Sequence, residues 1–106
     1  MRPQVVTVSS QASSAWIPVD MYQTPFNIGF GVTLATDSTL TYSVEHTFDD
    51  IFDSSVTPVA FPHATVAGET TNQDGNYAYP VRAIRLTVSA YTDGSATLTI
   101  LQGRKA

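Results

Sequence analysis

Apolar and polar residues alternate along three segments of this chain, and this period of two constrains the fold more than any other feature. The segments are residues 26–34, 40–48 and 84–90. Successive residues of a β-strand point to opposite faces, so each segment would have one apolar face and one polar face. No stretch of ten or more residues has apolar groups at helical spacing. We therefore expect antiparallel strands whose apolar faces share one core.

The order of the segments predicts two hairpins. The first two alternating segments would pair with each other across a turn near Asp37. The third would pair with residues 96–100 across a turn in which Gly94 takes the left-handed conformation that glycine adopts without strain. In both hairpins this register places the apolar residues of the two strands on the same face, as a shared core requires.

Weaker strands flank these hairpins. Residues 4–10 are predicted to form an N-terminal strand, and Pro18 confines residues 14–19 to a sheet edge, because proline cannot donate a ladder hydrogen bond. Residues 49–80 form the least regular part of the chain. A total of about six to eight short strands predicts an all-β fold, an antiparallel β-sandwich of jelly-roll-like or related topology.

Length and charge limit the domain organisation and the partners. A chain of 106 residues forms a single domain, which we place at residues 21–106, after an N-terminal strand and candidate arm at residues 1–20. Charged residues make up 13% of the chain, about half of the ~25% that is usual. The net charge of −4 argues against a nucleic-acid partner. No apolar run approaches the ~20 residues of a membrane-spanning helix, so we expect no membrane partner.

The acidic cluster Asp49, Asp50 and Asp53 is the first candidate for chemistry. Calcium needs six to eight oxygen ligands at about alternating loop positions, whereas two of these carboxylates are adjacent and diverge in an extended loop. A side-chain cap on a short helical turn explains the cluster better than a metal site. We therefore predict no metal ion here.

The two histidines, His46 and His63, are the second candidate. Imidazole and carboxylate ligands suit zinc, but His46 falls at an inward position of its strand and no third ligand has a suggestive spacing. The many hydroxyl groups permit accidental catalytic triads, but none lies in a Gly-x-Ser-x-Gly elbow. We therefore expect no catalytic residues, no cofactor and no enzymatic activity.

Arg82 and Arg85 are candidates for a contact between subunits. They lie near the entrance of a predicted strand and are explained either as solvated strand ends or as partners of the acidic cluster of a neighbouring subunit. The second interpretation rests on the guanidinium group, which binds carboxylates through two parallel hydrogen bonds. Charge reversal at Arg85 that left an assembly intact would count against it.

Trp16 is the last candidate. A tryptophan beside an irregular segment can belong to an oligomer interface, because such interfaces are enriched in aromatic residues. Aromatic rings displayed on a β-sandwich can also form a platform for sugar rings. The tyrosines that could join such a platform are Tyr22, Tyr77 and Tyr79.

Three stretches resemble the small virion proteins of tailed bacteriophages, over roughly residues 26–103. They are LTYSVEHTFDD (40–50), DGNYAYPVRAIRL (74–86) and ATLTILQG (96–103). The resemblance implies a capsid decoration or cement protein that binds the major capsid protein, sits over capsomer junctions as a dimer or trimer, and resides in the virion after assembly in the host cytoplasm. It carries no assignment of functional residues.

The expected function is therefore that of a non-enzymatic virion structural protein. Residues 1–20 could add a strand to a neighbour, and many weak contacts would sum over a symmetric shell. Two alternatives remain open. One is a phage tail or head–tail accessory protein, and the other is a carbohydrate-binding β-sandwich module built on Trp16.

Overall fold

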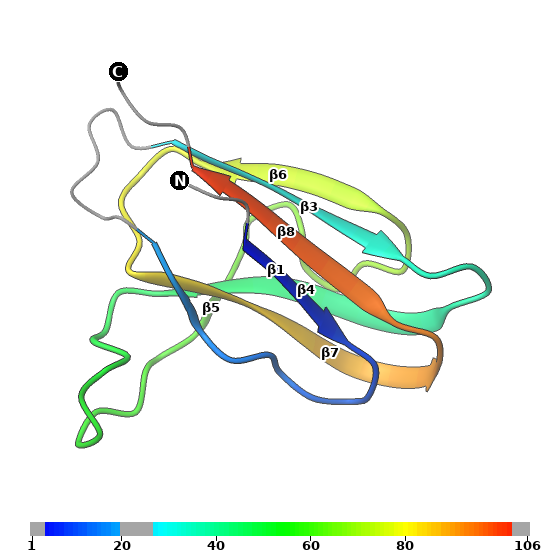
Figure 1. The fold of residues 1–106 in the computed structure, drawn as a ribbon, viewed down its shortest axis with the longest axis horizontal. Coiled ribbons are helices and arrows are strands. Elements are labelled where there is room, and N and C mark those ends of the chain that lie inside the picture. The colour runs from blue at the N-terminus through cyan, green and yellow to red at the C-terminus, as the bar shows by residue number, and fades with distance from the viewer. Residues whose placement is uncertain (1–3, 20–26, 103–106) are drawn as a thin grey trace.

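The protein is a sandwich of two four-stranded antiparallel sheets, seen in a computed structural model that describes residues 4–19 and 27–102 (Figure 1). One sheet has the order β1-β8-β3-β6 and the other the order β2-β7-β4-β5. The expected all-β sandwich is confirmed, and the described residues contain no helix that could span a membrane. The strands are β1 (Gln4–Val8), β2 (Ile17–Pro18), β3 (Ile28–Leu34), β4 (Thr39–Thr47), β5 (Phe61–Pro62), β6 (Gln73–Tyr77), β7 (Ala83–Asp93) and β8 (Ala96–Gln102).

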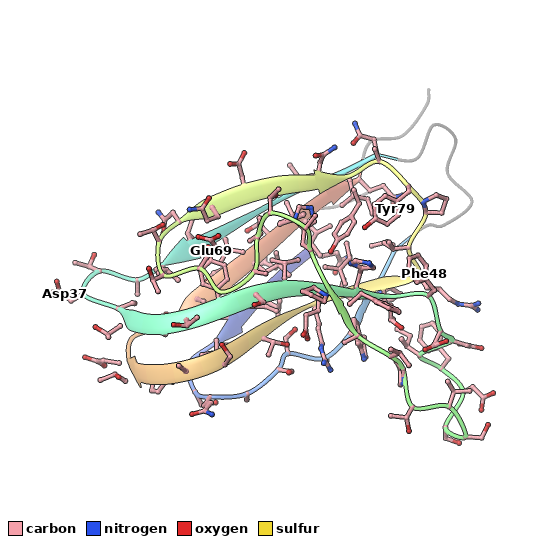
Figure 2. All side chains as sticks on the ribbon, turned by 180° about the vertical axis from the view of Figure 1, so that it is seen from behind. Asp37, Phe48, Glu69 and Tyr79 are labelled. Carbon is pink, nitrogen blue, oxygen red and sulfur yellow. The ribbon has the colours of Figure 1, made fainter. Side chains whose placement is uncertain are left out.

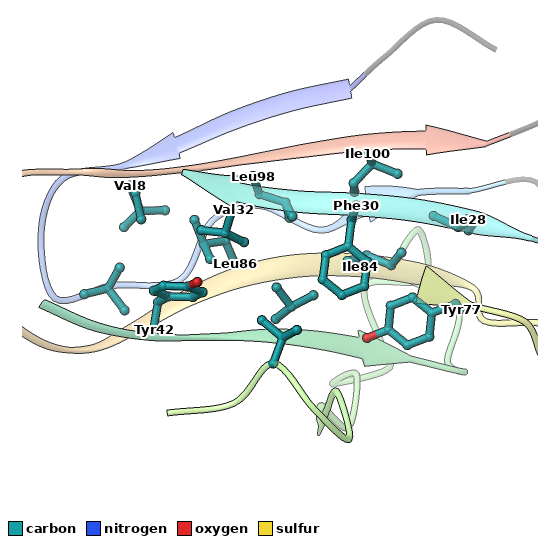
Figure 3. Close-up of a cluster of buried hydrophobic side chains, with 14 of the residues drawn as sticks. Val8, Ile28, Phe30, Val32, Tyr42, Tyr77, Ile84, Leu86, Leu98 and Ile100 are labelled. Carbon is teal, nitrogen blue, oxygen red and sulfur yellow. The ribbon is translucent and has the colours of Figure 1, made fainter. Parts of the chain in front are cut away.

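The core lies between the two sheets and follows the predicted alternation. In β3, Ile28, Phe30 and Val32 are buried while the residues between them face outward. Figure 3 shows the inward side chains of both sheets meeting, with Phe30 opposite Ile84. Phe26, which the alternation placed at the start of this strand, lies outside the described residues. Fully buried aliphatic residues and two buried tyrosines fill the space that joins the sheets.

Both predicted hairpins are wrong. β7 pairs with β4, whereas β8 pairs with β1 and β3, so β7 and β8 belong to different sheets. β3 and β4 are separated in the same way. Each short loop crosses from one sheet to the other, and the inward faces then oppose each other across the core. Alternation is satisfied equally by this arrangement and by a hairpin, because it specifies a face and not a hydrogen-bonded partner.

The two crossing loops pack against each other at one end of the sandwich. Gly94 has φ +94°, as the sequence predicted, and Asp37 has φ +63° in the other loop. The backbone N–H of Ala35 donates to the Ser95 carbonyl at 3.1 Å, and the Ser95 N–H donates to the Ser38 hydroxyl at 3.2 Å. These hydrogen bonds join the ends of both sheets.

The N-terminal segment contributes one edge strand to each sheet. β1 lies beside β8 in the first sheet, with Val8 buried, and β2 lies beside β7 in the second. Pro18 is in this edge strand, as its chemistry predicted. That the segment also reaches a neighbouring subunit as an arm stays a prediction.

Candidate functional site

Three half-exposed aromatic rings gather at one end of the sandwich. Phe48 follows β4, Phe61 lies in β5 and Tyr79 follows β6. Their exposed fractions are 50%, 44% and 47%, and the centroid of the Phe48 ring lies 5.7 Å from that of Phe61 and 6.5 Å from that of Tyr79. Figure 2 shows Phe48 and Tyr79 at the end opposite Asp37. We call these three residues the aromatic end surface.

His46 lies beneath this surface and touches all three rings. Its ring centroid is 5.4 Å from that of Phe48 and 5.8 Å from those of Phe61 and Tyr79. The β4–β5 register, in which His46 is opposite Phe61, sets this stack. His46 Nδ1 is hydrogen-bonded at 2.9 Å to the hydroxyl of Tyr77, which is fully buried. The exposed rings therefore rest on a buried polar pair.

This buried pair is electrically neutral. Burial lowers the pKa of His46 below its usual value of 6.5, and the nearby imidazole of His63 lowers it further. Burial also raises the pKa of Tyr77 well above its usual range. At neutral pH the His46–Tyr77 pair beneath the aromatic end surface is consequently uncharged. No charge on this pair opposes the burial of the three rings against a partner.

Stability should fall as the pH is lowered through the usual histidine pKa of 6.5. In the folded protein the lowered pKa of His46 keeps the imidazole neutral, whereas the unfolded chain takes up a proton at its ordinary pKa. The stabilisation is complete above 6.5 and is lost between that pH and the lower folded pKa. Denaturant unfolding at a series of pH values measures this slope. In His46→Asn, which keeps His63, the unfolding free energy should depend less on pH. An equally steep dependence in the variant would contradict the assignment of the slope to His46.

The acidic cluster forms two consecutive turns rather than a helical turn. The predicted cap is found at Asp50, and Asp53 caps the second turn, but the segment contains no helix, and Asp49 is hydrogen-bonded to a residue ten positions on. Hydrogen bonds from Ser55 also hold the pKa of Asp53 below its usual value. Each carboxylate accepts a hydrogen bond from a backbone N–H: Asp49 from Val59 at 2.8 Å, Asp50 from Phe52 at 3.0 Å and Asp53 from Ser55 at 2.9 Å.

Both predicted arginines face carboxylates of their own chain. Arg82 lies 3.8 Å from Asp50 in a half-exposed pair, so the structure brings Arg82 and the acidic cluster together within one subunit. Arg85 Nε donates to Glu45 at 2.8 Å across the β4–β7 ladder. An intersubunit ion pair would have to replace one of these contacts, and it stays a prediction.

Trp16 is part of a polar network on the outer face of the second sheet. The Arg85 guanidinium lies 4.4 Å from the Trp16 ring centroid, a cation–π contact that covers one face of the indole. Tyr77 is buried. Of the platform tyrosines, Tyr77 therefore offers no open ring, Tyr79 is 47% exposed, and Tyr22 lies outside the described residues.

The two imidazoles of the described chain lie in hydrogen-bond networks and not in a cluster of metal ligands. Within residues 4–19 and 27–102 no group of three His, Cys, Asp or Glu could hold a metal ion. His63 Nε2–H donates to the Asn76 carbonyl at 2.9 Å, and its Nδ1 accepts N–H groups of Thr65 and Val66 at 3.2 Å. Both imidazoles thus have partners in their own chain. An open groove of about 240 Å³ carries hydroxyls but no acid or base; it is lined by Ser38, Thr39, Leu40, Thr41, Thr70, Ala90, Tyr91 and Thr92.

Sequence reasoning missed the aromatic end surface. The alternation placed Phe48 on an apolar strand face, and Tyr79 was named only as a possible member of a sugar platform with Trp16; Phe61 was not a candidate. The sequence does contain a signal: Phe61 directly precedes Pro62, and Tyr79 directly precedes Pro80. Proline interrupts the hydrogen bonding of a strand, so an aromatic residue before it is expected at the end or edge of a sheet. The convergence of these rings on His46 depends on long-range pairing and could not be derived from spacing.

Comparison with known proteins yields a likeness in fold alone. No protein-family model and no curated protein matches the chain. It is similar to a chain in a solved structure described as "Bacillus endospore appendages form a novel family of disulfide-linked pili", with a TM-score of 0.50 and 10% identity, covering 99% of this chain and 87% of that chain. At that identity the likeness extends to the β-sandwich and not to function.

Proposed function

We propose that this chain is a non-enzymatic structural protein of a tailed-bacteriophage virion, a decoration or cement protein that binds the major capsid protein. The observation that carries the proposal is the aromatic end surface. Three half-exposed rings above an uncharged His46–Tyr77 pair expose apolar surface whose contact with water is unfavourable. Exposed apolar patches of this kind mark contact sites. The resemblance of residues 26–103 to small phage virion proteins directs the choice of partner.

The aromatic end surface has the properties of an interface centre. A large aromatic side chain buries about 150–250 Å², so covering the exposed halves of three rings would remove roughly 300 Å² from water. The acidic cluster follows Phe48 in the chain, and Arg82, three residues after Tyr79, is paired with Asp50; together they would supply the polar rim that surrounds such centres. A contact of this size is modest by itself, and repetition over a symmetric shell multiplies it.

A subunit of a protein filament is the second candidate. The fold shared with a chain from disulfide-linked pili favours it. This chain has no cysteine, so a filament built from it would be held by non-covalent contacts. A tail or head–tail accessory protein would use the same surface on a different partner. A carbohydrate-binding module ranks below these candidates, because Arg85 covers one face of Trp16 and Tyr77 is buried.

Co-sedimentation with purified capsids tests the proposal. We expect the protein to pellet with capsids, and Phe48→Ser or Tyr79→Ser to weaken binding at least about tenfold, since central aromatic residues dominate interface energies. Tyr91→Ser is the control for tyrosine removal. It makes the same change far from the aromatic end surface, where Tyr91 packs against the core and its hydroxyl donates to the Gly94 carbonyl, so any loss of stability is expected to be at least as large as in Tyr79→Ser.

The control should retain capsid binding. Equal losses in Tyr79→Ser and Tyr91→Ser would show a general effect of tyrosine removal and would count against the aromatic end surface. Wild-type protein that stays in the supernatant while forming filaments alone would favour the second candidate instead.

A further inference from the structure

Nothing in the described part of the chain packs over two glycines of the central strand β3. Gly29 and Gly31 are at outward positions of the strand, and a Cβ built on either would meet no described atom within 4 Å. Neither has a positive φ, so neither supports a turn. Glycine weakens a strand because it orders a flexible backbone and packs no side chain. A close approach of another backbone or side chain to this face would account for glycine here.

The outer face of the β1-β8-β3-β6 sheet is nearly free of charge. The ladder registers arrange its residues in three rows, and Asp74 on the edge strand β6 is the one ionisable group among them. Val5 and Leu101 are 60% and 53% exposed. The rows are Thr7, Thr97 and Thr33; then Val5, Thr99, Gly31 and Asp74; then Leu101, Gly29 and Asn76.

These rows produce a ridge and a groove side by side. Leu101 and Thr99 on β8, with Val5 on β1, form the ridge, and the bare backbone at Gly29 and Gly31 forms the floor of a groove along β3. A twofold axis between the ridge and the groove would place the ridge of each copy in the groove of the other. The face is therefore complementary to itself, as an isologous dimer interface requires.

Charge selects a second copy as the occupant of this face. The described residues include eight carboxylates but only two cationic side chains, Arg82 and Arg85, and both arginines are in ion pairs. Each copy has a net charge of −4, so two copies repel each other where these carboxylates face one another. The outer face of this sheet is where they can approach without juxtaposing like charges, and the missing side chains at the glycines let the backbones come close.

We infer that two copies of this chain associate through the outer faces of their β1-β8-β3-β6 sheets, with Val5 and Leu101 of each copy packed against Gly29 and Gly31 of the other. Strand spacings of ~4.8 Å and ~3.3 Å per residue give each face roughly 400 Å² of flat area. The two faces together would bury about 800 Å², less than the ~1,200 Å² of a stable interface, so the dimer is weak in solution and is reinforced where copies are arrayed. The inference is independent of which partner binds the aromatic end surface.

Sedimentation equilibrium over a concentration series tests the inference. The wild-type protein should show a concentration-dependent dimer. Gly29→Thr with Gly31→Thr fills the groove, and Leu101→Asp puts a charge on the ridge. Each change should raise the dimer dissociation constant at least about tenfold. Ser89→Thr, a similar increase in strand propensity at an exposed position of β7, is the control and should dimerise as the wild type does.

Thermal unfolding separates the inference from misfolding. The double threonine variant should unfold at a higher temperature than the wild type, because threonine favours strands more than glycine does. A lower unfolding temperature would show that the fold itself needs the glycines and would overturn the inference. So would a wild-type protein that stays monomeric at every soluble concentration, or a dimer that Phe48→Ser disrupts and the groove variant does not.

Discussion

Replacing Gly94 by alanine is expected to lower the free energy of unfolding by about 3 kcal/mol or more. Gly94 has φ +94°, a conformation that alanine adopts only with strain. An added Cβ would also collide with the Ser38 hydroxyl and would lie 2.6 Å from Ser38 Cα. The Cα atom belongs to the backbone of the other crossing loop and cannot rotate away. Chemical denaturation of both proteins measures the difference.

Gly68→Ala is the matched control for this prediction. Gly68 has φ +64°, but no described atom lies within 4 Å of the position of its Cβ. Alanine there should cost only the left-handed backbone strain of about 1–2 kcal/mol. The excess cost at Gly94 then measures the close approach of the two crossing loops. Equal costs at the two positions would show that the loops separate easily.

The crossing loops also explain why strand pairing could not be predicted. The alternation correctly identified inward residues such as Phe30, Val44 and Leu86, because burial acts on each strand face separately. The same residues point into the core whether a loop returns in the same sheet or crosses to the other. The crossing consists of the long-range pairings of β4 with β7 and of β3 with β8, accompanied by the hydrogen bond between Ser38 and Ser95, 57 positions apart, and a single sequence carries no sign of these contacts.

The candidate site illustrates the same limit. Asp50 and Arg82 were recognisable as partners by charge, but the sequence could not show that they belong to one subunit rather than two. The aromatic end surface needs β5 and the residue after β6 to converge on His46. Those strands lie in the segment 49–80, where irregular composition hides pairing. Local patterns therefore predicted the side-chain chemistry but not the neighbours that give it a function.

The glycines of β3 are a different case, because they are visible in the sequence as outward residues of an alternating strand. Glycine at such positions has several explanations, among them a bulge, a bend or a close contact inside the chain. Only the structure removes these, since Gly29 and Gly31 have ordinary strand conformation and empty space beyond them. The inferred dimer explains them by a close approach from outside the described residues, and the two glycines then carry information about assembly.

A disulfide introduced by Thr7→Cys with Thr97→Cys is expected to raise the free energy of unfolding by about 4 kcal/mol. The two hydroxyl oxygens are 3.0 Å apart, and Thr7 is opposite Thr97 in the β1–β8 ladder. Facing residues of antiparallel strands have the separation that a disulfide needs. The bond would close a loop between residues 90 positions apart, which removes much entropy from the unfolded chain. The absence of native cysteine leaves no competing thiol.

The same variant tests whether residues 1–20 act as an arm. If β1 stays in its own sandwich, oxidation yields a monomer on a non-reducing gel. If β1 instead pairs with β8 of a neighbouring copy, oxidation at low concentration yields covalent dimers. That result would contradict the β1–β8 pairing within one chain and would support the arm. Thr33→Cys with Thr97→Cys is the control, since it joins β3 to β8 and must form within one chain in either case. If both cysteine pairs give a monomer and reduction removes the added stability, β1 lies in the sheet of its own chain. Any strand exchange between subunits would then have to involve residues other than β1.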